Sequence, residues 1–148
     1  MNNLDDQFEE FVKNLQKEID EEESKIFSKR VIELSHSPKN WGKMENPTVE
    51  DKFLGPCGDT MQFFLKINEK DNVIMKITFI TDGCGPSVAS GSQLTIKAEN
   101  KSIEEASKIR PNDILKVLEG LPSSHTHCPV LAVNTLDKVL KKYLESKK

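Results

Sequence analysis

The chain has 148 residues, of which 36% are hydrophobic and 30% are charged, and its formal net charge at pH 7 is −3. These proportions are typical of one folded domain, and the lack of a basic excess argues against a nucleic-acid-binding protein. The sequence shows neither the features of a signal peptide nor an apolar run of membrane-spanning length, so we expect a protein of the reducing cytoplasm, not of a membrane.

The first part of the chain predicts two successive helices. Apolar residues recur at three- and four-residue steps over residues 3–23, opposite a strongly acidic face. We expect this apolar stripe to pack against the domain or against another chain. A second helix is predicted over residues 25–35. Residues 1–24 are interpreted as an N-terminal helical extension and residues 25–148 as the main domain.

The middle of the chain has the period of two that is typical of strands. Residues 49–54 predict a short edge strand, and residues 61–67 and 73–80 predict two longer strands. The polar segment 68–72 between the longer strands has the length of a hairpin loop, so we expect an antiparallel hairpin. Alternation in its second strand places one set of side chains on one face of the sheet: Val73, Met75, Ile77 and Phe79.

After the hairpin the pattern returns to helices. We expect a helix from Gly85 to about residue 99, a capped helix over residues 102–109, a short helix over residues 113–119 and a last helix opened by Pro129. A small antiparallel sheet of about three strands, with helices packed on it, is an α+β arrangement.

The three cysteines stand out because each has neighbours that suit metal or sulfur chemistry. Cys84 and Cys128 precede prolines that are predicted to lie in the first turns of helices, where free N–H groups and the helix dipole stabilise a thiolate. Cys57 lies between glycines in the loop before the hairpin. Three thiolates and one further ligand would complete a four-ligand set for zinc or for an iron–sulfur cluster.

Two residues are candidates for the fourth ligand. His127 precedes the third cysteine, and Asp59 follows the first by two residues. A carboxylate is a hard ligand beside soft iron and sulfur, so a site completed by Asp59 would release its cargo more easily. Simpler interpretations stay open for each of these residues. The cysteines can be small buried side chains. Asp59 can be a turn residue, and His127 can be a surface histidine. His125 and His36 are interpreted as structural.

Together these motifs resemble the iron–sulfur cluster assembly scaffold proteins of the NifU N-terminal and IscU type. The resemblance rests on residues 55–59, 83–90 and 127–128, with the upstream stretch 28–42 in support, and it covers about residues 25–145. Several motifs in the same order are far more specific than any one of them alone.

The resemblance implies a scaffold or carrier, not an enzyme in the strict sense. Such a protein takes sulfur from a cysteine desulfurase, assembles a transient [2Fe-2S] cluster with iron and passes it to apo-proteins, and zinc can occupy the same ligands. A monomer and a homo-oligomer are both compatible with it. By the same resemblance, Cys128 would accept the sulfur, and the ligands would be Cys57, Cys84 and Cys128, with Asp59 and His127 at the exchangeable fourth position.

One segment departs from the family pattern. Residues 121–125, Leu-Pro-Ser-Ser-His, stand where the best-studied branch has Leu-Pro-Pro-Val-Lys, a loop that a heat-shock chaperone binds. This difference argues against chaperone-driven release. Two alternatives are a structural zinc-binding module and a zinc-dependent sulfur-transfer protein. Members of the latter branch usually carry a long insertion between the second and third cysteines and lack the histidine before the third.

Overall fold

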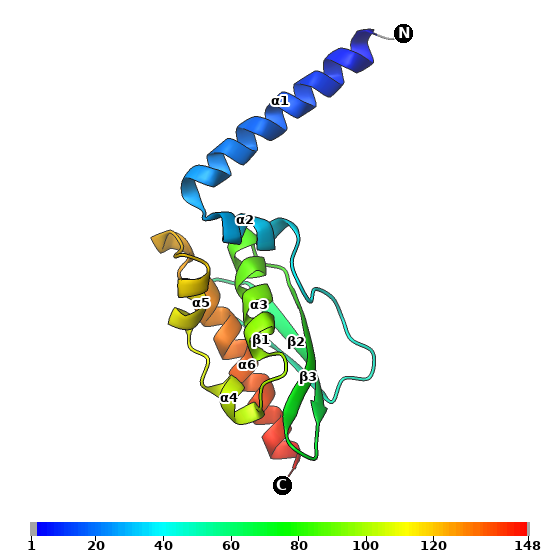
Figure 1. Ribbon diagram of the computed structural model, residues 1–148, viewed down its shortest axis with the longest axis vertical. Helices are drawn as coiled ribbons and strands as arrows, with labels where there is room; N and C mark the ends of the chain where they lie inside the picture. Colours follow the sequence, from blue (N-terminus) through cyan, green and yellow to red (C-terminus); the bar gives the residue numbers. More distant parts are fainter. Residues whose placement is uncertain (1–2, 148) are drawn as a thin grey trace.

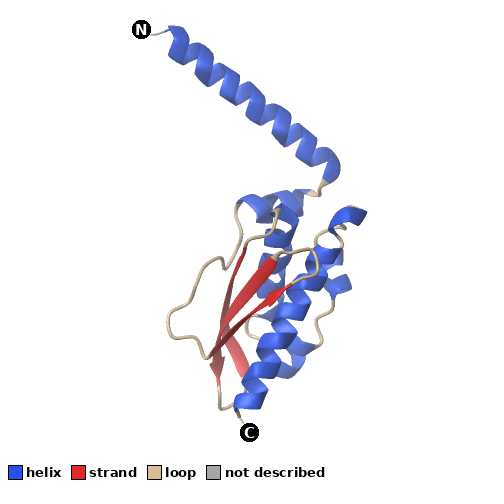
Figure 2. Cartoon of the chain, turned by 180° about the vertical axis from the view of Figure 1, so that it is seen from behind, coloured by secondary structure: helices blue, strands red, loops and turns tan. Residues whose placement is uncertain are grey.

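A three-stranded antiparallel sheet in the order β1-β2-β3 forms the centre of the computed structural model, which describes residues 3–147. β1 spans Val49–Leu54, β2 spans Thr60–Asn68 and β3 spans Val73–Thr81. The long helices α3 (Gly85–Ala98) and α6 (His127–Ser146) cover one face of the sheet (Figures 1 and 2). The predicted α+β class is therefore confirmed. The other helices are α1 (Asn3–Ile26), α2 (Lys29–His36), α4 (Ile103–Ser107), α5 (Pro111–Val117) and the 3-10 turn η1 (Ser123–His125).

A β-bulge in the hairpin changes which side chains of β3 face the core. The register shifts between Lys66 and Ile67, and Met75 is the extra residue on β3. As a result Ile74 is fully buried, whereas the side chain of Met75 is 54% exposed. The strict alternation predicted from the sequence was wrong at Met75, because one inserted residue turns the following side chains to the opposite face.

Two helices begin earlier than the sequence pattern indicated. α5 begins at Pro111, because proline suits the first turn and the Asp113 carboxylate accepts a hydrogen bond from the backbone N–H of the residue before the helix. α6 begins at His127 and not at Pro129. The histidine and Cys128 therefore belong to the first turn of α6, which fixes their directions relative to the sheet.

Close packing of α3 on the sheet sets the position of its N-terminus. A Cβ atom added to Gly91 would lie 2.6 Å from Cε2 of Phe79, so only glycine allows this approach. Phe79 is fully buried, and the Trp41 ring meets it edge-on with 5.2 Å between the ring centroids. Any larger side chain at Gly91 would push α3, and with it the cysteine at its start, away from the sheet.

α1 projects from the domain as a single long helix (Figure 1). It continues to Ile26, where Phe27 and Ser28 separate it from α2. Ser28 caps α2 by accepting from the N–H of Val31, and it donates to the carbonyl oxygen of Leu118. Of the two expected partners of the apolar stripe, the domain is excluded and another chain stays a prediction. The side chains of the stripe are 44–73% exposed: Leu4, Phe8, Phe11, Leu15 and Ile19.

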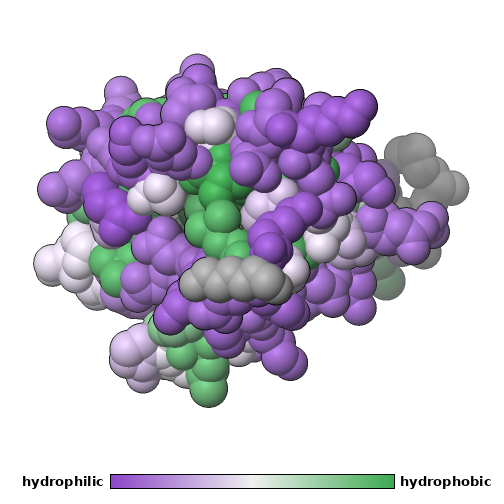
Figure 3. Space-filling model, turned by 90° about the horizontal axis from the view of Figure 1, so that it is seen from below, coloured by the Kyte–Doolittle hydropathy of each residue, from purple (hydrophilic) through white to green (hydrophobic). Residues whose placement is uncertain are grey.

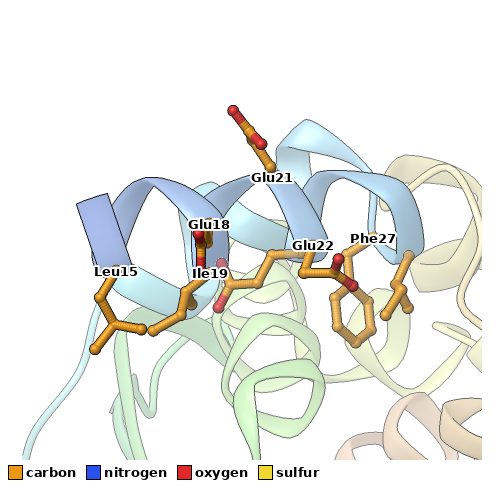
Figure 4. Close-up of a pocket in the computed structure, with 8 residues that line it drawn as sticks. Leu15, Glu18, Ile19, Glu21, Glu22 and Phe27 are labelled. Atoms are coloured by element: carbon orange, nitrogen blue, oxygen red, sulfur yellow. The ribbon is translucent and has the colours of Figure 1, made fainter. Parts of the chain in front are cut away.

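Two surfaces complete the description. A hollow of about 430 Å³ lies along the C-terminal half of α1, and its lining includes Leu15, Ile19, Glu22 and Phe27 (Figure 4). Seen from the opposite end, the surface is mainly hydrophilic, with a small apolar area near its middle (Figure 3). Among the described residues, no helix combines the length and apolar composition needed to cross a bilayer.

Deleting residues 1–24 is expected to change the melting temperature by no more than about 3 °C, because none of the described residues of α1 is buried. The measurement is differential scanning calorimetry of the truncated and full-length chains. As a control, Leu34→Ala removes a side chain that is 1% exposed and should cost about 2–5 kcal/mol. A truncation as damaging as Leu34→Ala would show that α1 is packed in solution.

Candidate metal centre

Three segments that are distant in the sequence meet at the end of the domain from which α1 departs (Figure 1). The β1–β2 turn carries Cys57 and Asp59, the start of α3 carries Cys84, and the first turn of α6 carries His127 and Cys128. All five residues singled out in the sequence are therefore neighbours in space.

Glycines in the β1–β2 turn bring it against α6. Gly58 has a φ of +93°, a conformation that favours glycine. A Cβ atom added to Gly55 would lie 3.1 Å from Cδ1 of Leu131 on α6. The N–H of Gly55 also donates to the carbonyl oxygen of Asp59 at 2.8 Å, which closes the turn. The turn thus holds Cys57 and the Asp59 carboxylate beside the start of α6.

A serine hydroxyl connects the other two thiols. Cys84 is the N-cap of α3, and Ser87 lies one turn into the helix. The Ser87 hydroxyl donates to Sγ of Cys128 at 3.3 Å and lies 3.9 Å from Sγ of Cys84. We had assigned no role to Ser87 from the sequence. The signal that could have found it is its position three residues after a cysteine at a helix start.

Burial makes Cys128 unlike the other two cysteines. Its side chain is 0% exposed, whereas Cys57 and Cys84 are exposed. Loss of water around the thiol is the main reason that its pKa is raised to about 12; the hydrogen bond from Ser87 opposes the rise, and the charge of Cys84 adds to it. In the metal-free chain, desolvation therefore opposes the thiolate form that the helix start was expected to favour at Cys128.

The donor atoms form two groups of three within the described part of the chain. In each group the ligand atoms lie within 4.8 Å of one another, and Nε2 of His127 is 3.8 Å from Sγ of Cys128, which joins the groups. His125, interpreted from the sequence as structural, belongs to one of them. The groups are Cys84, His125 and Cys128, and Cys57, Asp59 and His127.

The donor set suits a soft cation or an iron–sulfur cluster. Thiolates and imidazoles are the ligands of zinc and of clusters, and a neighbouring carboxylate can complete either site. Two of the thiols are exposed, and the third, Cys128, is buried with its Sγ 3.8 Å from Nε2 of His127. A cargo held here would therefore be anchored in the domain and still be reachable from solvent.

Alkylation by iodoacetamide is expected to modify Cys57 and Cys84 before Cys128 in the metal-free protein at neutral pH. A buried thiol with a pKa near 12 stays protonated, so the thiolate fraction of Cys128 should rise about tenfold per pH unit between pH 8 and pH 10. Peptide mapping by mass spectrometry gives the three rates. Equal rates for all three cysteines at neutral pH would contradict the burial of Cys128.

Comparison with known proteins agrees with this arrangement. A family model described as the NifU-like N terminal domain matches residues 26–148. The chain is 34% identical over 119 residues to the iron-sulfur cluster assembly scaffold protein IscU of Aquifex aeolicus (strain VF5), and the match covers 80% of this chain and 76% of that protein. Identity to IscU 1 of Archaeoglobus fulgidus is 36% over 119 residues, with the same coverage of both chains.

A solved structure shares the fold as well. The N-terminal part of a nitrogen-fixing NifU-like protein from Brucella abortus superposes with a TM-score of 0.63 at 17% identity. The superposition covers 82% of this chain and 95% of that one, so it extends over nearly the whole of the neighbour. On the family match and the identities to its relatives, this chain belongs to the family of NifU-like N-terminal domains.

Proposed function

We propose that this protein is a scaffold on which an iron–sulfur cluster is assembled and from which it is passed to apo-proteins. The observation that carries the proposal is the convergence of three thiols from separate segments with a carboxylate and imidazoles. A site built from distant segments can open when those segments move apart. This property suits a protein that releases its cluster better than one that keeps the cluster bound. The relatives named as scaffold proteins support the same function.

In this proposal the cargo is a transient [2Fe-2S] cluster. Cys57, Cys84 and Cys128 are its thiolate ligands, and the fourth position is filled by Asp59 or His127. Both candidates lie in the donor group of Cys57, and Nε2 of His127 is also 3.8 Å from Sγ of Cys128. A hard carboxylate or a single imidazole in place of a fourth thiolate lowers the cost of releasing the cluster.

Sulfur enters, in our proposal, as a persulfide from a cysteine desulfurase. Once exposed to water, the Cys128 thiol loses its proton to solvent, and the thiolate attacks the outer sulfur of the donor persulfide. The donor's sulfur–sulfur bond breaks, the donor cysteine leaves as a thiolate, and Cys128 becomes the persulfide. Because Cys128 is buried, the groups packed around its thiol must first move aside. An apolar groove of about 360 Å³, bounded by Phe53, Cys57 and Val130, offers a place for the donor's mobile segment. Persulfide chemistry of this kind suits a reducing compartment such as the cytoplasm.

Anaerobic reconstitution tests the scaffold function. The full chain is incubated with ferrous iron, cysteine, a cysteine desulfurase and a dithiol reductant, which supplies the two electrons that convert each persulfide sulfur into sulfide. It is then mixed with an apo-ferredoxin. We expect iron–sulfur absorption bands to develop on the chain and then to appear on the ferredoxin. Absence of such bands would exclude a cluster scaffold. Tightly held zinc, whose removal abolishes stimulation of the desulfurase, would instead identify a zinc-dependent sulfur-transfer protein.

A further inference from the structure

α1 exposes a continuous apolar stripe, and none of its described residues is buried. Six side chains of the stripe are 44–67% exposed: Phe8, Phe11, Val12, Leu15, Ile19 and Ile26. An apolar stripe of this length on one side of a helix is typical of a surface that packs against another element. The match to the family begins at residue 26, so nearly all of α1 lies outside the part of the chain that the family shares.

Carboxylates border this stripe. Glu22 lies three residues after Ile19 and four before Ile26, so it falls within the stripe itself. Figure 4 shows Leu15, Ile19 and Glu22 on the same side of α1, where together with Glu18 they line the hollow of about 430 Å³. The stripe therefore suits a surface that is both apolar and basic.

The charge of α1 argues against the pairing of two such helices. The helix has three lysines against nine aspartates and glutamates, which gives a net charge of −6. Lys13 and Lys17 lie two residues from stripe positions and therefore on the far side of the helix, so they cannot screen the bordering carboxylates from those of a second α1. The whole chain has a net charge of −3, so the residues outside α1 together carry +3.

A groove of complementary character lies on the domain, between the C-terminal end of α3 and the helices α4 and α5. Its volume is about 410 Å³, and its lining combines two isoleucines with three lysines: Ile96, Ile109, Lys97, Lys101 and Lys108. Nζ of Lys108 lies 3.8 Å from a carboxylate oxygen of Glu104. Lys97 and Lys101 form no salt bridge with any residue that the structure describes, so their charges are available to an acidic helix.

Two carboxylates also line the groove, but backbone N–H groups already engage them. Glu105 accepts a hydrogen bond from the N–H of Ser102 at 3.3 Å, and Asp113 accepts one from the N–H of Arg110 at 2.8 Å. Both carboxylates thus cap the short helices beside the groove. The lysines remain as the charges that the groove presents to a partner.

We propose that α1 of one copy of the chain docks in the groove between α3, α4 and α5 of a second copy, and that the exchange is reciprocal. The 24 residues of α1 rise about 1.5 Å each, so the helix is about 36 Å long and reaches well beyond its own domain. Because the helix and the groove are different surfaces, mutual exchange closes the assembly as a two-fold dimer. Both contacts then contribute to one interface.

The docking groove is separate from the metal centre. Cys84 lies at the start of α3, whereas the groove lies at the other end of that helix, about 20 Å away along its axis. The exchange of α1 therefore leaves the thiols accessible, and the inference does not depend on the proposed function. A weak dimer of this kind dissociates on heating before the domain unfolds, so the melting temperature of the domain depends little on α1.

Analytical ultracentrifugation of the full chain at tens of micromolar tests the exchange. We expect a reversible dimer of about 33 kDa, twice the 16.7 kDa of one chain. Phe11→Ala combined with Leu15→Ala should raise the dissociation constant at least about tenfold. Lys13→Ala combined with Lys17→Ala, on the far side of the same helix, is the matched control and should stay within about threefold of the parent. A monomeric parent would overturn the inference.

Reversal of charge tests whether the groove is the docking site. Lys97→Glu combined with Lys101→Glu should raise the dissociation constant at least about tenfold, because the groove then repels the acidic helix. The matched control reverses two exposed lysines that pair across β2 and β3, Lys66 and Lys76, and should leave dimerisation within about threefold of the parent. An unchanged dimer in the groove variant would show that α1 docks elsewhere, and circular dichroism confirms that each variant is folded.

Reversal of charge on α1 separates this exchange from the pairing of two α1 helices. Glu18→Lys combined with Glu22→Lys should weaken the dimer of the parent groove, and joining it to the reversed groove should restore the dissociation constant to within about threefold. A tighter dimer in the α1 variant alone would show that the two helices pair with each other and would overturn the inference. All these variants keep the three thiols, so iron–sulfur bands in reconstitution report on the scaffold function separately.

Discussion

Replacing Cys128 by alanine is expected to abolish cluster assembly while the chain stays folded. The thiol of Cys128 lies between the hydroxyl of Ser87 and the imidazole of His127, so its loss leaves the buried side of the site without a sulfur ligand. Removing one buried sulfur should cost about 1–2 kcal/mol of the 5–15 kcal/mol typical of a folded domain. Absorption after anaerobic reconstitution and thermal melting followed by circular dichroism measure the two effects.

Ser90→Ala is the matched control for this experiment. Ser90 is fully buried in α3 and donates to the carbonyl oxygen of Pro86 without a hydrogen bond to a thiol. Its loss should cost about 1 kcal/mol and leave cluster assembly intact. If Cys128→Ala unfolds the chain instead, the cysteine belongs to a structural zinc module. If that variant assembles clusters at the parent rate, Cys128 is not a ligand.

Asp59→Ala is expected to lengthen the lifetime of the assembled cluster by about tenfold, equivalent to about 1.4 kcal/mol in the barrier to release. The physical reason is the loss of the carboxylate that we propose as the hard, exchangeable ligand. The turn itself should survive, because its hydrogen bond to Gly55 uses the Asp59 backbone carbonyl and not the side chain. Decay of the iron–sulfur absorption in the presence of a chelator gives the lifetime.

The same substitution should also lower the pKa of the Cys128 thiol, because the negative charge of Asp59 is one of the causes that raise it. Alkylation of Cys128 at a fixed pH should then be faster than in the parent. Asp82→Asn is the control, since Asp82 accepts from the N–H of Thr60 at 2.7 Å and lies outside both donor groups. A shorter cluster lifetime in Asp59→Ala would disprove the role given to this carboxylate.

Local patterns in the sequence determined most of the secondary structure. The period of two identified the hairpin of β2 and β3. Residues 102–105 predicted a capping box, and the structure confirms it between Ser102 and Glu105. Such features follow from interactions between residues close in sequence. The three cysteine motifs also predicted which segments carry the chemistry, because each combines a thiol with glycine, proline or histidine neighbours.

The tertiary structure alone decided the features that depend on contact between distant segments. The bulge at Met75 and the exposure of the α1 stripe could not be read from periodicity, because periodicity shows which side chains share a face but not what covers it. The burial of Cys128 raises the pKa of its thiol, which its position at a helix start does not reveal. The fold also brings Nδ1 of His125 to 3.9 Å from Sγ of Cys84, and the His125 ring against the ring of the distant Phe27. Sequence by itself thus supplied the reactive groups, whereas packing of remote segments set their solvation and their partners.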